Sequence, residues 1–212
     1  MAYTLTSLNV SLAKPLLIDD REVMTGIVKR PVDGPVAVGP LGLAGDEQAD
    51  LSVHGGPGKA IYAYPREHYP FWQTVRAQAR VAEWGAALSP GSLGENLTLT
   101  GLLEDQVCIG DVLRFTDCEL AVSEPRFPCF KFNAVMGFSQ ASKLMAANGW
   151  CGFYLAVRRP GSLRAGERFE LVHGPREVGI TELFRARVGR GRRGAGTSTP
   201  LCPLRCFAML RP

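Results

Sequence analysis

Apolar residues in this chain gather in short alternating runs separated by glycine and proline, and this spacing is the feature that most constrains the fold. Runs of strand length occupy residues 4–12, 23–29, 60–64, 97–100, 112–115, 119–123, 150–158 and 168–172. Only two segments between them have helical spacing, residues 65–79 and 133–148. In the first, Tyr69 and Trp72 share one face, which we expect in the core, and Gly149 is well placed to end the second. Many strands with few helices do not make alternating β-α-β units, so we predict a β-rich α+β fold, a barrel with peripheral helices.

The chain is long enough for one principal domain, because 212 residues with 46% hydrophobic composition can bury a sizeable core. We predict a barrel domain over residues 1–176 and the start of a C-terminal helical appendage over residues 177–188. A Gly- and Pro-rich passage, residues 31–59, has the length of a functional loop. Residues 189–212 are rich in Gly, Arg, Ser and Thr, which predicts an irregular, disordered tail.

The positive charge of the chain is concentrated near its end. The formal net charge is +4, and residues 184–212 hold seven arginines and no acid. The preceding residues therefore hold 17 cations against 20 acids and are mildly acidic. A generally basic surface for nucleic acid is not supported, and we expect no nucleic-acid partner.

Composition also indicates the compartment. No apolar run reaches about 18 residues, so we expect no membrane-spanning helix and no membrane partner. The first ten residues lack the basic and apolar segments of a secretory signal. The six cysteines are scattered, which argues against a disulfide framework. We expect a cytoplasmic protein.

The strongest candidate for a chemical role is Cys129, which stands on a segment stiffened by Pro125 and Pro128. The segment follows the strand predicted over residues 119–123, and functional groups often stand on loops at strand ends. Arg126 and Lys131 flank the thiol and would favour its thiolate, the form that attacks electrophiles and binds metals. Lone cysteines are usually inert core residues, but these flanking residues favour a function here.

Two further segments carry unexplained polar groups. In residues 54–59, Gly55 and Gly56 would let backbone N–H groups face an anion, while His54 and Lys59 add donors. The spacing does not match a P-loop, and taken alone a surface turn is the better interpretation. Asn96 can both donate and accept hydrogen bonds, as recognition of a heterocycle edge requires, although asparagine is common in turns. We predict that Arg126, Lys131, His54, Lys59 and Asn96 line one pocket with Cys129 at its edge.

Taken in order, five segments resemble one protein family. They are Gly45-Asp46-Glu47-Gln48-Ala49-Asp50, Val53-His54-Gly55-Gly56-Pro57, Tyr64-Pro65-Arg66-Glu67-His68-Tyr69, Gly94-Glu95-Asn96-Leu97 and Pro125-Arg126-Phe127-Pro128-Cys129. Over roughly residues 1–188 the chain resembles a MOSC-domain (molybdenum cofactor sulfurase C-terminal-like) protein, most closely the bacterial YiiM type.

The resemblance implies a β-barrel-like fold that binds a mononuclear molybdenum cofactor, a molybdopterin, with Cys129 as the metal ligand. It implies that Arg126, Lys131, His54 and Lys59, with the backbone of Gly55 and Gly56, hold the pterin phosphate. The implied activity is the reduction of N-hydroxylated compounds such as hydroxylaminopurines or amidoximes, a detoxification of base analogues. A flavin-type reductase would supply electrons, and pyridoxal phosphate binding is not expected.

One departure from the resemblance leaves alternatives open. YiiM-type proteins continue into a small helical subdomain, of which only a first helix, residues 180–188, is expected here. The chain could therefore bind or carry the cofactor without turnover. A thiol enzyme with Cys129 as nucleophile is a third possibility, for which His54 would have to approach as the base.

Overall fold

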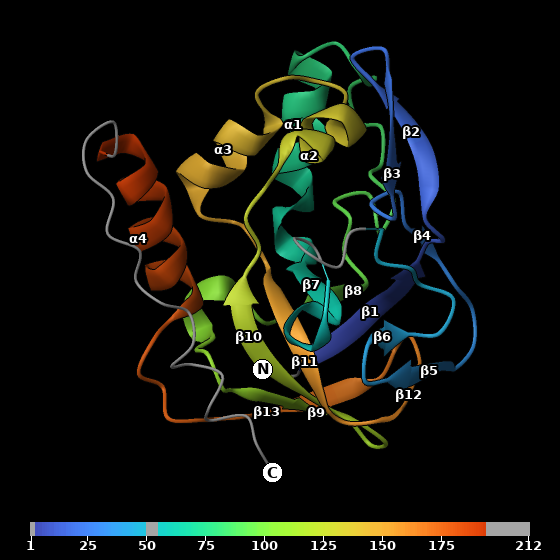
Figure 1. Ribbon diagram of the computed structural model, residues 1–212, viewed down its shortest axis with the longest axis vertical. Coiled ribbons are helices and arrows are strands. Elements are labelled where there is room, and N and C mark those ends of the chain that lie inside the picture. Colours follow the sequence, from blue (N-terminus) through green and yellow to red (C-terminus); the bar gives the residue numbers. More distant parts are fainter. Residues whose placement is uncertain (1–2, 50–54, 194–212) are drawn as a thin grey trace.

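The computed structural model describes residues 3–49 and 55–193, and its centre is a closed β-barrel (Figure 1). The strands of the barrel are β1 (Tyr3–Val10), β13 (Arg168–Val172), β9 (Val112–Arg114), β10 (Glu119–Pro125), β11 (Phe153–Arg159), β7 (Ile61–Pro65) and β8 (Leu97–Thr100). They neighbour one another in this order, and β8 pairs back to β1. All pairs are antiparallel except β7–β8, which is parallel. The fold is thus the β-rich barrel with peripheral helices that the strand pattern predicts.

Smaller sheets flank the barrel. The strand β4 (Arg30–Pro31) pairs with the end of β1, and β2 (Lys14–Ile18) and β3 (Arg21–Thr25) form a separate hairpin. A three-stranded sheet contains β12 (Gly161–Leu163), β5 (Val36–Gly39) and β6 (Gly42–Leu43). The passage over residues 31–59 is therefore not one continuous loop as its composition predicted. Its strands are only two to four residues long, too short for a periodic pattern to reveal.

Three helices lie at one end of the barrel (Figure 1). A 3-10 turn, η2 (Arg66–His68), leads into α1 (Tyr69–Gln78), whose buried residues include Tyr69 and Trp72, as the aromatic spacing predicted. The predicted helix over residues 133–148 is instead two helices, α2 (Phe130–Met136) and α3 (Ala141–Asn148). Gly137 ends α2 with φ of 83°, a left-handed conformation that breaks the helix, and Gly149 ends α3 as expected.

The last described element is α4 (Ile180–Arg193), which packs beside β10 through buried Ile180 and Phe184 (Figure 1). The sequence predicted that this helix ends at Val188 and that an irregular tail begins at residue 189. The helix instead continues to Arg193, so the predicted start of the tail is wrong by five residues. Arginine is a good helix former, and each of the two glycines in this stretch costs about 1 kcal/mol without stopping the helix. The rest of the tail lies outside the described residues. Within the described part of the chain, no helix has the length and apolar character needed to cross a lipid bilayer.

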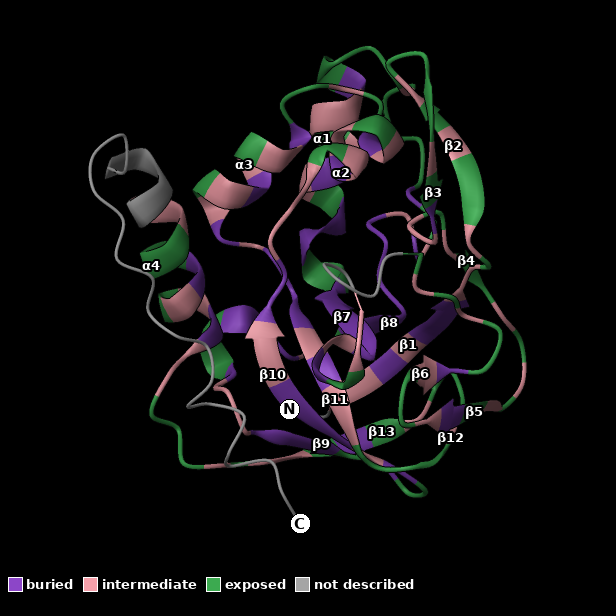
Figure 2. Cartoon of the chain, viewed as in Figure 1, coloured by how far each residue is buried: buried purple, intermediate pink, exposed green. Residues whose placement is uncertain are grey.

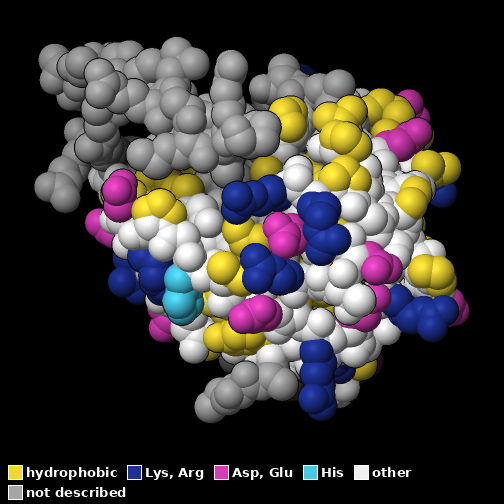
Figure 3. Space-filling model, turned by 90° about the horizontal axis from the view of Figure 1, so that it is seen from below, with side chains coloured by type: hydrophobic (Ala, Val, Ile, Leu, Met, Phe, Trp, Pro, Cys, Tyr) yellow, Lys and Arg dark blue, Asp and Glu magenta, His cyan; other side chains and the backbone are white. Residues whose placement is uncertain are grey.

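The core fills the barrel and the space under α1, where the buried side chains concentrate (Figure 2). Trp72 donates to the hydroxyl of Tyr64 at 2.7 Å, and His68 lies 2.8 Å from Glu104 and stacks on Trp150. His68 is thus a buried structural residue. On the face seen in Figure 3, lysines and arginines intermingle with acids and apolar side chains.

Candidate functional site

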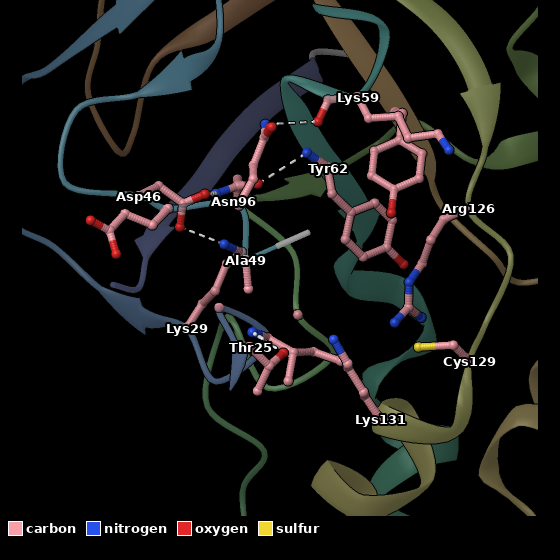
Figure 4. A pocket seen from close by; sticks show the side chains of 16 residues that line it. Thr25, Lys29, Asp46, Ala49, Lys59, Tyr62, Asn96, Arg126, Cys129 and Lys131 are labelled. Atoms are coloured by element: carbon pink, nitrogen blue, oxygen red, sulfur yellow. Dashed lines mark hydrogen bonds and ion pairs between the residues drawn. The ribbon is translucent and has the colours of Figure 1, made fainter. Parts of the chain in front are cut away.

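One pocket lies where the β2–β3 hairpin, the barrel and the start of α2 meet (Figure 4). Its walls come from segments far apart in the sequence, each placed by a different strand end. The lining residues are Thr25, Gly26, Ile27, Lys29, Asp46, Glu47, Gln48, Ala49, Lys59, Tyr62, Gly94, Asn96, Arg126, Cys129, Lys131 and Tyr154. Five of the residues that the sequence pointed to are among them: Lys59, Asn96, Arg126, Cys129 and Lys131. The structure therefore brings these five together, while their roles in binding a ligand stay predictions.

Cys129 stands between a strand and a helix. The strand β10 ends at Pro125, and Cys129 takes an extended conformation, with φ of −117° and ψ of 177°, immediately before α2. Its carbonyl accepts the backbone N–H of Phe132 at 3.0 Å, which holds the first turn of α2. The thiol is half-buried, and in Figure 4 its sulfur lies beside the guanidinium of Arg126. The cysteine is thus held by regular structure on both sides.

Arg126 is a buried cation without an acidic partner among the described residues. Its exposed fraction is 5%, and its guanidinium lies 5.1 Å from the ring centre of Tyr62 and 4.8 Å from that of Phe132. The Nη1 atom also lies 3.5 Å from the sulfur of Met145. Burial opposes the charge, but nearby Tyr62 and Tyr154 and the Cys129 thiol outweigh it and raise the pKa of Arg126. A buried guanidinium that keeps its charge in this way favours an anion in the pocket.

Two lysines add positive charge. Lys59 lies 3.7 Å from Glu124 and 5.9 Å from the ring centre of Tyr154. Lys131 donates from Nζ to the backbone carbonyl of Met24 at 3.2 Å, which ties α2 to the hairpin. Both side chains are only partly buried, so each can reach a ligand that enters from solvent.

The opposite wall holds an ion pair that the sequence did not reveal. Lys29 and Asp46 are in contact, with side chains 8% and 6% exposed. Asp46 also accepts the backbone N–H of Ser11 and the amide of Asn96, each at 2.8 Å. The only available signal was the acidic run itself, because Lys29 is 17 residues away in the chain.

Asn96 holds the wall of the pocket through its amide. Its Oδ1 accepts the backbone N–H of Tyr62 at 3.1 Å, and its Nδ2 donates to the carbonyl of Asn9 at 3.2 Å as well as to Asp46. Both amide protons are therefore engaged within the protein. The Nδ2 atom therefore has no proton left for a ligand, and the predicted contact of Asn96 with a heterocycle stays a prediction that concerns Oδ1 alone.

The preceding residue, Glu95, is fully buried, and the sequence did not predict its role in the site. It accepts hydrogen bonds from the Tyr69 hydroxyl, from Gly91 N at 2.8 Å, Leu93 N at 3.1 Å and Thr98 Oγ1 at 2.8 Å. Burial raises the pKa of this carboxyl group, and the hydrogen bonds oppose the rise. Glu95 thus shapes the turn that carries Asn96.

The glycine-rich segment is only partly in the pocket. Gly56 donates its N–H to Gln48 Oε1 at 3.0 Å, and Gln48 Nε2 donates to the carbonyl of Lys59 at 3.2 Å. The side chain of Gln48 therefore stabilises the loop over residues 56–59 through hydrogen bonds to its backbone. Gly55 and Gly56 are described but do not line the pocket, and His54 lies outside the described residues, so its predicted approach to Cys129 stays a prediction.

Comparison with known proteins identifies the family. The MOSC domain model matches residues 50–170, which is more than half of the chain. The chain belongs to the MOSC domain family. The match includes Asn96, Arg126 and Cys129, and it covers half of the residues that line the pocket.

Three relatives are similar in sequence to this chain over most of its length. "Uncharacterized protein YflK" of Bacillus subtilis is 39% identical over 88% of this chain and 80% of its own length. "Protein YiiM" of Escherichia coli is 40% identical over 74% of this chain and 68% of its own length. A protein of Gibberella moniliformis named "Reductase" is 36% identical over 78% of this chain, which spans 29% of that longer protein.

Solved structures have the same fold. The crystal structure of YiiM from Geobacillus stearothermophilus matches with a TM-score of 0.70 and 31% identity, over 98% of this chain and 97% of that one. YiiM from Escherichia coli matches with a TM-score of 0.63 and 31% identity, over 87% of this chain and 76% of that one. The chain is thus a YiiM-type MOSC protein in fold and sequence.

Proposed function

We propose that this MOSC protein binds the molybdenum cofactor in the pocket through Cys129 and reduces N-hydroxylated compounds. The observation that carries the proposal is the buried Arg126 cation beside the Cys129 sulfur, without an acidic partner among the described residues. Membership of the MOSC family and a relative named "Reductase" support it.

The residues present fit such a cofactor. A soft thiolate is a suitable ligand for a soft metal centre. Four cations line the pocket, Lys29, Lys59, Arg126 and Lys131, against two carboxylates, one of which is already paired with Lys29. The remaining positive charge suits the phosphate of a pterin, and the rings of Tyr62 and Tyr154, 5.5 Å apart, provide an apolar wall.

The proposed reaction converts an N-hydroxyl group to an amine or amidine with uptake of two electrons and two protons and loss of water. The cofactor supplies the two-electron redox chemistry when it is bound. The protein supplies the thiolate, the cations that fix the anionic group, and a wall that limits access by water. Electrons come from a flavin-type reductase in this proposal, and the reaction removes N-hydroxylated base analogues in the cytoplasm.

Metal analysis separates this proposal from its alternatives. The protein is produced in cells with an intact cofactor pathway, as wild type, as Cys129→Ala and as Cys108→Ala, a control for a half-buried cysteine outside the pocket. We expect stoichiometric molybdenum in wild type and the control, and none in Cys129→Ala. Reduction of 6-hydroxylaminopurine or benzamidoxime with a flavin-linked donor should follow the metal.

Each alternative has its own outcome in these assays. Molybdenum without turnover would favour a carrier protein and contradict the reductase. A wild type without molybdenum, but with an activity abolished by thiol alkylation, would favour the nucleophile alternative. Equal molybdenum in wild type and Cys129→Ala would remove Cys129 as the ligand.

A further inference from the structure

In the Lys29–Asp46 pair, Asp46 is held in place by several hydrogen bonds, whereas the Lys29 ammonium makes only one to the described residues. Asp46 accepts three donors, Lys29 Nζ, Ser11 N and Asn96 Nδ2, so its position is set by three separate segments. A lysine ammonium carries three protons. Among residues 3–49 and 55–193, Asp46 is the one hydrogen-bond partner of Lys29 Nζ. Lys29 therefore has donor capacity left, and it lines the pocket.

Lys29 lies on the wall of the pocket opposite the Cys129 sulfur. In Figure 4, Lys29 and Asp46 lie on one side of the pocket, whereas Arg126, Cys129 and Lys131 lie on the other. The Lys29 ammonium contacts Asp46, so a group bound between the two sides would lie between this ion pair and the Cys129 sulfur.

The charges around Lys29 determine how tightly it holds its protons. Burial lowers the pKa of Lys29, and the carboxylates of Asp46 and Glu95 partly oppose this effect. The other titratable groups that line the pocket are Glu47, Lys59, Tyr62, Arg126, Cys129, Lys131 and Tyr154. The cations among them disfavour a further positive charge. Lys29 is therefore a better proton donor than an exposed lysine.

We propose that Lys29 is the catalytic acid that protonates the departing hydroxyl oxygen when an N-hydroxylated substrate is reduced in this pocket. The inference rests on the proposed function. The N–O bond breaks, two electrons from the flavin-type donor pass to nitrogen, and Lys29 gives its proton to the leaving oxygen. The Lys29 proton thus completes the water, a second proton from solvent adds to nitrogen to complete the amine, and solvent reprotonates Lys29. Hydroxide is a poor leaving group, which is why the step needs an acid.

Two substitutions at one position separate proton donation from charge. Lys29→Met removes the proton and the charge, whereas Lys29→Arg keeps a cation that does not deprotonate in proteins. We expect kcat to fall about 100-fold or more in both, the usual contribution of a general acid. Molybdenum content should stay at the wild-type level. Lys143→Met, at an exposed position on α3, is the control. A Lys29→Arg variant with wild-type kcat would overturn proton donation.

The leaving group provides a sharper test. An O-acetylated hydroxylamine releases acetate, which leaves without a proton. We expect Lys29→Met and wild type to reduce the O-acetyl compound at similar rates while differing about 100-fold on the free N-hydroxyl compound. An equal loss on both substrates would show that Lys29 only supports the pocket, and would overturn the catalytic role.

A measurement without turnover complements the kinetics. Competitive labelling of the purified protein with acetic anhydride across pH, read by mass spectrometry, gives a titration midpoint for each lysine. We expect the midpoint of Lys29 to lie below that of Lys143, because burial disfavours its charged form. A midpoint at or above that of Lys143 would contradict the inference.

An active wild type with a fully active Lys29→Met would overturn the role of Lys29 alone, whereas an inactive wild type would overturn the proposed function and with it this role.

Discussion

At the scale of single residues, Cys129 is the position on which the proposed function depends. We expect Cys129→Ser to fold normally, because the side chain is half-buried and close in size, and to lose molybdenum and reductase activity, because a hard hydroxyl replaces a soft thiolate. Circular dichroism checks the fold, and X-ray absorption reports the sulfur ligands of the metal. An unchanged sulfur shell, or retained activity, in Cys129→Ser would contradict the assignment.

Glu95 gives a second prediction at this scale, about stability. Glu95→Gln replaces one acceptor oxygen by an N–H₂ group that faces donors such as Leu93 N, so we expect a loss of about 1–3 kcal/mol in the free energy of unfolding. Burial raises the pKa of Glu95 in the folded state, so the native protein binds a proton more readily than the unfolded chain. Lowering the pH from 7 toward 5 should therefore stabilise wild type relative to Glu95→Gln.

Urea unfolding of both proteins at pH 7 and pH 5 measures this effect. A stability difference that shrinks at the lower pH would show that the folded-state pKa of Glu95 is not raised.

At the scale of elements, Gly137 separates α2 from α3. Its φ of 83° is costly for other residues, and a Cβ there would lie 3.3 Å from the Cβ of Val81. We expect Gly137→Ala to lower the free energy of unfolding by about 2–3 kcal/mol, from backbone strain and crowding together.

Gly34→Ala is the matched control, because Gly34 has φ of 79° and open space around it. It should cost only the strain, about 1–2 kcal/mol. Chemical denaturation of the two variants compares them. Equal losses would mean that Val81 moves aside and that the contact adds nothing.

At the scale of the whole molecule, the C-terminal helix is held at its beginning. Ile180 and Phe184 are buried, and Val188 packs against the core. Deleting residues 189–212 leaves all three in place, and the composition of that segment predicts little burial. We expect the melting temperature to change little and cofactor binding to persist.

The contrasting variant is Phe184→Ala, which removes a fully buried ring stacked 5.3 Å from Phe127. It should cost about 3–5 kcal/mol. Thermal unfolding of both proteins decides the matter. A large loss on deletion of residues 189–212 would show that the segment contributes to the fold.

Much of the element order could be predicted from sequence because periodicity is a local property. The strands at residues 97–100 and 168–172 have the predicted bounds, and the aromatic spacing placed Tyr69 and Trp72 in the core. The break at Gly137 was missed because a glycine inside a helical pattern is usually tolerated. The short strands within residues 30–43 were missed because two to four residues carry no period.

By itself, the sequence determined that the fold is a barrel and that Cys129 is held on a stiff segment between two cations. Both follow from neighbours in the chain, the alternation of apolar residues and the restraint of proline on φ. Only the tertiary structure decided that β13 pairs with β1, that Arg126 is buried between Tyr62 and Phe132, and that Lys29 meets Asp46. These contacts join segments distant in the chain, and they exist only once strand register and barrel closure have brought those segments together.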